Sequence, residues 1–149
     1  MRLLIILLTS LLFLGYACTS SQPAAGRESS SESLYQYQWD LFELKGKPIT
    51  QTERVQPHLL LYPGEIGRIA GSAGCNQIAG KFELSGDHTL HISPIMTTKM
   101  ACPDQDLETQ LMRTLGEVDG WGIADKVLEL RIGKKVAARF TGVTPGQKM

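Results

Sequence analysis

The chain has 149 residues, the length of a single domain, and its 15 basic residues balance its 15 acidic residues. Hydrophobic residues make up 42% of the chain and charged residues 20%, a globular composition that excludes a wholly disordered protein. Because the net charge is zero, no excess positive field attracts phosphates, and general nucleic-acid binding is not expected.

The N-terminal segment has the pattern of a secretory signal peptide. Arg2 is followed by a dozen mostly apolar residues, fewer than the roughly 20 that a membrane-spanning helix needs. The small residues Gly15 and Ala17 allow cleavage directly before Cys18. The sequence therefore predicts a signal peptide over residues 1–17.

Residues 14–18 resemble the lipobox of bacterial lipoproteins, in which the cysteine is acylated and becomes the first residue of the mature protein. The residues that follow are rich in serine and almost free of apolar side chains. Residues 18–34 are therefore predicted to be a lipidated Cys18, carrying acyl chains such as palmitate, and a flexible tether. The alternative is an ordinary secreted protein that begins with an unmodified Cys18.

The three cysteines are an odd number, which needs an explanation in a secreted protein. Lipidation of Cys18 leaves Cys75 and Cys102 as a pair in an oxidising compartment. A disulfide between them would stabilise the fold by about 3.5 kcal/mol on the chain-entropy model. The alternative is two unpaired, buried thiols.

Residues 35–142 are the predicted domain, and residues 143–149 are a C-terminal tail. Several segments of the domain alternate apolar and polar residues with period two, as strands with one buried face do. The expected strands are residues 39–44, 58–62, 67–71, 81–84, 89–93, 128–132 and 136–140. Gly133-Lys134 favours a hairpin between the last two.

One segment has helical rather than strand spacing. Its apolar face carries Leu107, Leu111, Leu115 and Val118. Pro103 and the acidic residues after it are typical of a helix start, and Gly116 is typical of a helix end. The expected fold class is mainly β (α+β), either a small antiparallel sheet or a cracked β-barrel with one packed helix, with both tryptophans in the core or at its rim.

The glycine-rich run of residues 71–82 invites two functional interpretations. A phosphate-binding loop is rejected, because Cys75 and Phe82 stand where that motif needs a glycine and a serine or threonine. A hydrolase with Ser72 as its nucleophile is the least favoured hypothesis, because no helix is expected to follow the serine. The structural interpretation is a tight turn between strands in which Asn76 takes a positive φ.

No metal site, cofactor or catalytic residue is predicted. His88 and His91 could join Cys75 and Cys102 around zinc, but residues three apart on a strand point to opposite faces and the two cysteines are isolated. Solvated or loop histidines are expected instead. The carboxylates are scattered singly, so no general acid–base pair is proposed.

The segment MTTKMAC, residues 96–102, is the second unusual stretch. Methionines adapt to varied partners, so this segment could form an apolar binding lip. The favoured interpretation is that Met96 and Met100 fill the gap between the helix and the sheet.

Taken in order, these stretches resemble the META domain of the HslJ-like family of bacterial lipoproteins. The similarity covers about Tyr37 to Thr141, and its most specific part is the combination of Gly74-Cys75-Asn76 with Met100-Ala101-Cys102. The matching segments are Trp39, Gly46-Lys47-Pro48-Ile49, Gly71-Ser72-Ala73-Gly74-Cys75-Asn76, Gly80, residues 96–102 and an acidic helix that contains Glu108.

The resemblance implies a compact, mainly antiparallel β-fold with one helix, anchored at the bacterial envelope, and no known catalytic residues or cofactor. Members of the family are associated with heat or envelope stress, antibiotic tolerance, motility and secretion. A related fold in a secretion-system pilot lipoprotein binds acyl chains within a cracked barrel, which is an analogy at the level of the fold alone.

The resemblance and the residues together predict a non-enzymatic lipoprotein, anchored at the outer membrane and facing the periplasm, whose domain contacts another envelope protein in stress response or envelope maintenance. The alternative is a carrier or sensor of an apolar acyl-chain ligand bound between helix and sheet. The residues of the family motif and candidate binding lip are Gly71, Gly74, Asn76, Gly80, Met96, Thr97, Thr98 and Met100.

Overall fold

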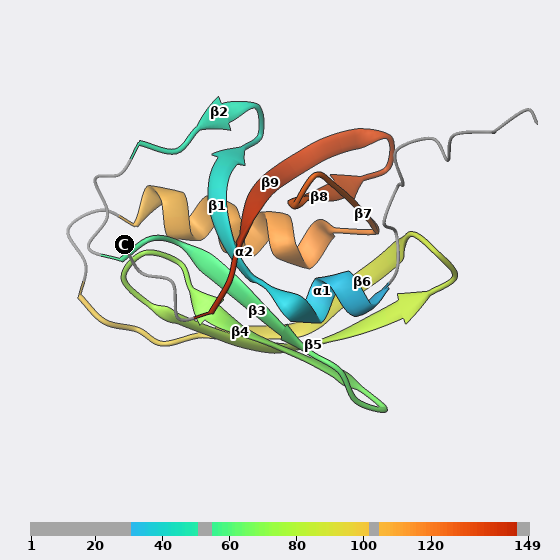
Figure 1. The fold of residues 1–149 in the computed structure, drawn as a ribbon. Helices are drawn as coiled ribbons and strands as arrows, with labels where there is room; N and C mark the ends of the chain where they lie inside the picture. Colours follow the sequence, from blue (N-terminus) through green and yellow to red (C-terminus); the bar gives the residue numbers. More distant parts are fainter. Residues whose placement is uncertain (1–30, 51–54, 102–104, 146–149) are drawn as a thin grey trace, which may run out of the picture.

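The computed structural model describes residues 31–50, 55–101 and 105–145 of the chain. These residues form nine strands and two helices (Figure 1). In chain order they are α1 (Ser31–Gln36), β1 (Gln38–Leu44), β2 (Lys47–Pro48), β3 (His58–Tyr62), β4 (Gly67–Ser72), β5 (Gln77–Ser85), β6 (Thr89–Thr97), α2 (Asp106–Glu117), β7 (Gly120–Ala124), β8 (Val127–Ile132) and β9 (Lys135–Val143). Neither of these helices is long and apolar enough to cross a membrane.

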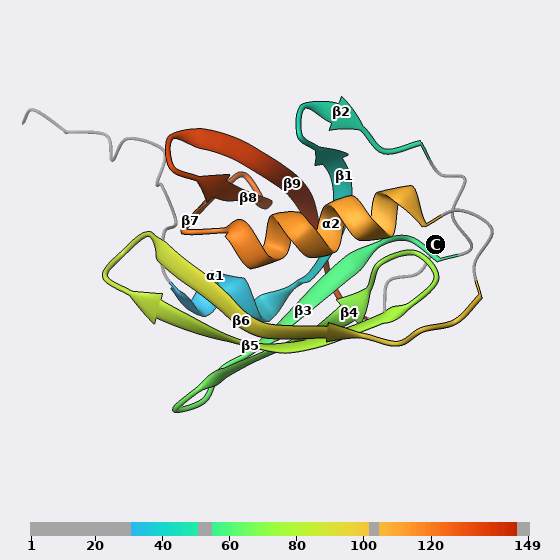
Figure 2. The same cartoon turned by 180° about the vertical axis from the view of Figure 1, so that it is seen from behind.

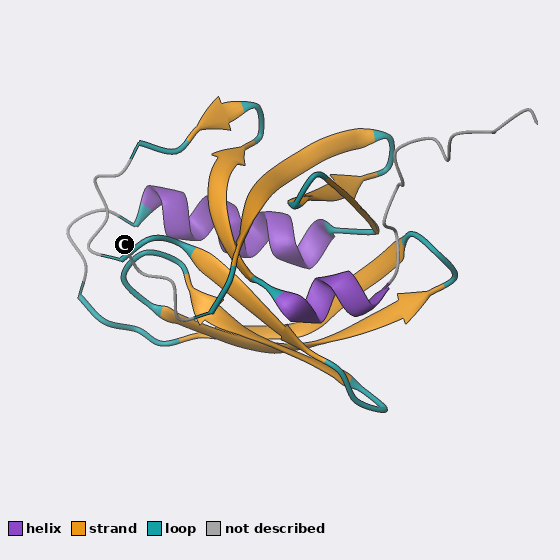
Figure 3. Ribbon diagram, in the orientation of Figure 1, coloured by secondary structure: helices purple, strands orange, loops and turns teal. Residues whose placement is uncertain are grey.

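The strands form one antiparallel sheet that closes on itself (Figure 3). Their order is β2-β1-β3-β4-β5-β6-β7-β8-β9, and β1 also pairs with β9. The ring is weakest between β6 and β7, which pair at Thr89 and Gly120 alone. α2 contacts β6 and lies between it and strands β7 to β9 (Figure 2). The expected mainly β fold with a packed helix is confirmed, as a ring-like sheet rather than a clean barrel.

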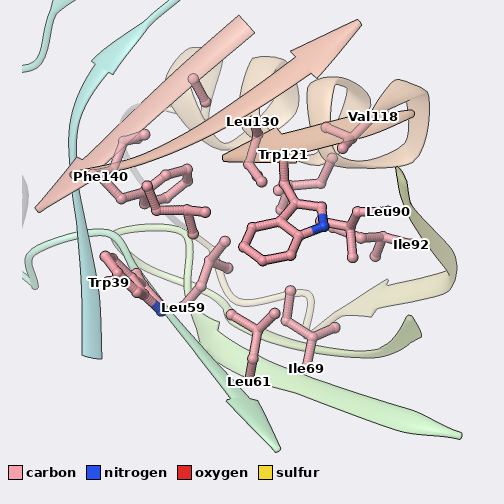
Figure 4. Close-up of a cluster of buried hydrophobic side chains, with 14 of the residues drawn as sticks. Trp39, Leu59, Leu61, Ile69, Leu90, Ile92, Val118, Trp121, Leu130 and Phe140 are labelled. Carbon is pink, nitrogen blue, oxygen red and sulfur yellow. The ribbon is translucent and has the colours of Figure 1, made fainter. Parts of the chain in front are cut away.

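The hydrophobic core lies inside the ring, against one face of α2. Leu111 and Leu115 are fully buried, so the apolar spacing correctly predicted the helix and the centre of its buried face. Leu107 is only partly buried, and Val118, 2% exposed, follows the helix in an extended conformation. Trp39 and Trp121 belong to the same cluster, which collects side chains from strands on all sides of the ring (Figure 4). The space between helix and sheet is therefore packed with side chains of the protein itself.

The strand pattern of the sequence was largely correct, with two instructive differences. β7 was missed, because Gly120 and Gly122 occupy its less buried positions and carry no polar side chain that would reveal the alternation. β6 continues beyond the expected residues 89–93 and through Pro94 to Thr97. The hairpin between β8 and β9 is confirmed, with Gly133 at a φ of 58°.

α1 begins inside the segment that was expected to be a tether. Leu34 is fully buried, and its carbonyl oxygen accepts a hydrogen bond of 2.9 Å from Nε1 of Trp39. Burial of the leucine and satisfaction of the indole N–H both stabilise this segment against the core. Residues 31–34 therefore belong to the folded region, whereas residues 1–30, with the predicted signal peptide and Cys18, lie outside the described residues.

Two glycines of the glycine-rich run allow neighbouring strands to approach closely. A Cβ on Gly71 would overlap the carbonyl oxygen of His58 in β3. A Cβ on Gly80 would lie 2.6 Å from the carbonyl oxygen of Pro94 in β6. Gly116, near the end of α2, has no such constraint, because nothing lies within 4 Å of its would-be Cβ.

Gly71→Ala is expected to lower the free energy of unfolding by about 1–3 kcal/mol or more, because the overlap can be relieved only by shifting β3 away from β4. Gly116→Ala, the matched control, is expected to raise it by up to about 1 kcal/mol, because alanine favours a helix over the unfolded chain. Urea denaturation of both variants measures the difference. Equal effects of the two substitutions would contradict this account of the strand packing.

Candidate functional site

The turn between β4 and β5 is built from hydrogen bonds within the family motif. The Gly74 N–H donates to Oγ of Ser72 at 3.1 Å, and Oγ of Ser72 donates to the carbonyl oxygen of Asn76 at 3.4 Å. Ser72 is fully buried. The expectation of a positive φ at Asn76 is wrong: Gly74 takes it, at 113°, because a glycine has no Cβ to clash there.

The Asn76 side chain is the buried centre of a polar cluster whose other members are half-buried or exposed. Its Nδ2 donates to both carboxylate oxygens of Glu108 in α2, at 3.0 and 2.9 Å. Its Oδ1 accepts hydrogen bonds from Oγ1 of Thr98 at 2.8 Å and from the Met100 N–H at 2.7 Å. Asn76 is 2% exposed, its carbonyl oxygen accepts two hydrogen bonds, and its amide nitrogen donates to both oxygens of one carboxylate. We call this group, with Thr97, the Asn76 cluster.

The end of β6 and the residues directly after it hydrogen-bond to the same cluster. Oγ1 of Thr97 donates to Oε1 of Glu108 at 3.3 Å. Oγ1 of Thr98 also accepts from the Gln77 N–H at 3.0 Å, while the Thr98 N–H donates to the carbonyl oxygen of Gln77 at 3.1 Å. The cluster therefore joins three segments that lie far apart in the sequence: the β4–β5 turn, the end of β6 and the first turn of α2.

The sequence placed most members of the cluster in one motif but did not identify Glu108 as their partner. Acidic residues in the first turn of a helix are common because the helix dipole favours them, so the carboxylate gave no distinct signal. The pairing joins residues 32 positions apart, a separation at which periodicity carries no information.

Met96 and Met100 do not fill the gap between helix and sheet. Their side chains are 61% and 53% exposed, because β6 and the backbone after it hold them on the outside of the ring. They lie beside the Asn76 cluster, with more than half of their surface exposed.

Cys75 is disulfide-bonded in the structure and directly precedes Asn76. Cys102 and Cys18 lie outside the described residues, so the pairing of Cys75 with Cys102 stays a prediction. The turn places one end of the disulfide next to the Asn76 cluster.

Among the residues that the structure describes, no histidine hydrogen-bonds to the Ser72 hydroxyl. His58 lies opposite Ser72 in the β3–β4 register, but its Nδ1 is 2.8 Å from the carbonyl oxygen of Gln56, and the serine hydroxyl is held within the turn. The His88 ring packs edge-on to Trp121, with centroids 6.3 Å apart. In the described part of the chain no three His, Cys, Asp or Glu side chains gather in a way that could hold a metal ion.

A second polar group joins β8, β9 and β1. Glu129 accepts hydrogen bonds from Arg131 at 2.8 Å and from Arg139 at 3.0 Å, and Arg139 also pairs with Glu43. The hydrogen bond from Arg131 is the main cause that lowers the pKa of Glu129, and the bond to Glu129 is the main cause that raises the pKa of Arg139. Charges paired in this way on neighbouring strands are typical of structural ion pairs.

The outer face of β3 to β6 carries a groove of about 380 Å³, which we call the outer groove. The lining side chains that define its chemistry are Tyr62, Arg68, Ala70, Ala79, Lys81 and Met96. The tyrosine and the methionine are among the exposed large apolar side chains of the described residues. Of the predicted site residues, Met96 and Gly80 lie at this groove, whereas Asn76, Thr97 and Thr98 lie in the Asn76 cluster.

Asn76→Ala is expected to lower the free energy of unfolding by about 1–3 kcal/mol, because it leaves the half-buried Glu108 carboxylate without its amide donor. Thr98→Val, which removes one hydroxyl from the edge of the cluster, is expected to cost about 1 kcal/mol. Urea denaturation measures both variants. An Asn76→Ala protein as stable as the parent would contradict a structural role for the cluster.

Cys75→Ser and Cys102→Ser are each expected to lower the melting temperature, and the double variant is expected to be hardly worse than either single one, because one shared disulfide is lost in every case. Thermal unfolding followed by circular dichroism measures the three variants. Additive losses in the double variant would show that the two cysteines do not share a bridge.

Comparison with known proteins agrees with this geometry. The META domain family matches residues 32–143. One similar NMR structure shares 25% sequence identity with a TM-score of 0.56, over 75% of this chain and 93% of its own. A second, of a protein from Burkholderia xenovorans, shares 18% identity with a TM-score of 0.63, over 83% of this chain and 92% of its own, and shows the fold alone. No match is found among the curated proteins. The chain belongs to the META domain family.

Proposed function

We propose that this protein is a lipid-anchored binding module of the bacterial envelope, whose META domain contacts an envelope partner and catalyses no reaction. The observation that carries the proposal is that the polar side chains of the motif hydrogen-bond to other groups of the protein. The Asn76 side chain hydrogen-bonds within the Asn76 cluster through both its amide nitrogen and its carbonyl oxygen, and the Ser72 hydroxyl is buried in its turn. Hydrogen-bonded polar side chains of this kind hold the backbone around them in one arrangement, so we assign them a structural role rather than a role in attacking a substrate.

The exposed side chains beside the cluster support a contact role. Met96 and Met100 are both more than half exposed and flank the threonines that hydrogen-bond into the cluster. A rigid backbone that carries two adaptable apolar side chains is suited to binding a partner surface. We assign this contact to stress response or envelope maintenance, following the family resemblance.

The anchor in this proposal is an acylated Cys18 followed by the serine-rich tether. Thr19 follows the cysteine, whereas lipoproteins retained at the inner membrane commonly carry Asp at that position, so we place the domain at the outer membrane, facing the periplasm. A tether of this kind lets the domain search for a partner near the membrane surface.

A carrier of an apolar acyl-chain ligand is the second candidate. A ligand between α2 and the sheet would have to displace Leu111 and Leu115, which are fully buried there. The outer groove offers apolar surface without that cost and favours a ligand on the outside of the ring. The Ser72 hydrolase remains the last-ranked hypothesis, and an active preparation that loses turnover on Ser72→Ala would revive it.

The anchor is tested by denaturing mass spectrometry of the protein released from membranes with a mild detergent. We expect a polypeptide that begins at Cys18 and carries the added mass of acyl chains, and we expect Cys18→Ser to leave the membrane fraction. An unmodified Cys18 at the N-terminus would contradict lipid anchoring and leave a secreted protein.

The contact is tested by placing a photo-crosslinking amino acid at Met100 in cells, with Lys135 on the β8–β9 hairpin as the control position. We expect a reproducible protein adduct from position 100 under envelope stress and none from position 135. Failure to find any reproducible partner under stress would contradict the proposed binding function.

A further inference from the structure

We propose that the outer groove binds a single-chain amphiphile with an anionic head group, the chain over its alanine floor and the head between Arg68 and Lys81. This inference deepens the second candidate function, the acyl-chain ligand, on which it rests, by naming the chemistry of a ligand at this face. It places the ligand outside the ring rather than in the core.

The strand register arranges the lining in two rows. Arg68 of β4 lies opposite Tyr62 of β3 and Lys81 of β5, which makes one row across three strands. Two residues further along the same face, Ala79 lies opposite Ala70 of β4 and Met96 of β6. Residues two apart on a strand share a face, so the charged row and the alanine row lie side by side.

The alanine row forms the apolar floor of the groove. The single methyl groups of Ala70 and Ala79 leave space between taller side chains, and Gly80 beside them adds none. Tyr62, 43% exposed, and Met96, 61% exposed, form apolar walls at opposite ends. A groove of about 380 Å³ is within the usual size of small-molecule sites, so it suits a hydrocarbon chain rather than a folded domain.

The charged row selects the head group. Arg68 and Lys81 are directly opposite in the register, and like charges in that position repel. Within the described ranges neither side chain forms an ion pair, whereas Arg131 and Arg139 both pair with Glu129. A carboxylate or phosphate between the two cations would offset their repulsion, and the guanidinium can bind it through two parallel hydrogen bonds. Charge complementarity therefore favours an anionic amphiphile over a neutral one.

The Asn76 cluster fixes one wall of this groove. Met96 is followed directly by Thr97 and Thr98, whose hydroxyls hydrogen-bond to Glu108 and Asn76. The cluster thereby holds the end of β6 and its exposed methionine against the alanine floor. The family motif would then serve ligand binding indirectly, as a support for the groove.

The test uses the Cys18→Ser variant. This variant lacks the cysteine that would be acylated, so no acyl chain of the protein's own can occupy the groove. Octanoate, 1-octanol and acetate are titrated separately, below micelle-forming concentrations, and binding is followed by amide chemical shifts. We expect saturable octanoate binding centred on β4 and β5, at least tenfold weaker binding of octanol, and no saturation with acetate. Equal affinity for octanoate and octanol, or no saturable octanoate binding, would overturn the proposal.

Variants separate the head-group contact from the groove. Arg68→Gln combined with Lys81→Gln is expected to weaken octanoate binding at least tenfold and to leave octanol binding unchanged. Ala79→Leu, which fills the floor, is expected to weaken both, with Met96→Ala as a second variant should the leucine disturb folding. Lys134→Gln combined with Lys135→Gln, which also removes two exposed positive charges, is the charge-matched control and is expected to change neither. Octanoate binding that survives both the double variant and the floor variants would overturn the assigned site.

The two proposals can fail separately. A protein adduct at Met100 without octanoate binding would overturn the amphiphile ligand and leave the proposed binding function standing. Octanoate binding without any protein adduct would support the groove ligand and overturn the contact with an envelope protein.

Discussion

The fold depends on one side-chain amide that joins three distant segments. Asn76 donates to both carboxylate oxygens of Glu108 and accepts from Thr98 and from the Met100 backbone, and it does so almost completely shielded from water. A buried polar network stabilises a unique arrangement when every member is satisfied and is costly when one is missing. The position of α2 relative to the sheet is therefore set by a specific contact as well as by hydrophobic packing.

This contact matters because the ring of strands is incomplete without α2. β6 and β7 share a single pair of opposed residues, so the sheet alone would leave this side of the core poorly covered. The helix covers it with Leu111 and Leu115, while Glu108 one turn earlier holds its N-terminal end to the β4–β5 turn and the end of β6. The apolar face stabilises the packing of the helix on the core. The polar contact fixes where the first turn of the helix lies relative to the β4–β5 turn and the end of β6.

The division between packed core and exposed surface also accounts for the functional proposals. The protein's own side chains fill the core, where a carrier would need an empty cavity. The polar groups of the motif hydrogen-bond to other parts of the fold. The functional proposals use two surface features of the described residues, the exposed methionines and the outer groove with its two opposed cations. The end of β6 and the residues directly after it supply Met96 to the groove and Thr97 and Thr98 to the Asn76 cluster, so stability and binding are coupled there.

Local patterns were sufficient to predict much of this fold. The spacing of Leu111 and Leu115 predicted the buried face of α2, and period-two alternation predicted most strands. Glycines at the less buried positions of β7 hid that strand, and a serine-rich sequence concealed α1, whose place depends on a contact between Leu34 and Trp39. The Asn76–Glu108 contact and the groove could not be predicted from local patterns, because both depend on strand register and helix placement.

Amide hydrogen exchange at Met100 tests the central role of the Asn76 cluster most directly. The N–H of this residue donates to Oδ1 of Asn76 at 2.7 Å, although its side chain is 53% exposed and its backbone lies outside regular secondary structure. The account predicts protection of this N–H close to that of the central strands β4 and β5, because both open only when the fold opens. Exchange at the rate of an unprotected loop would contradict it.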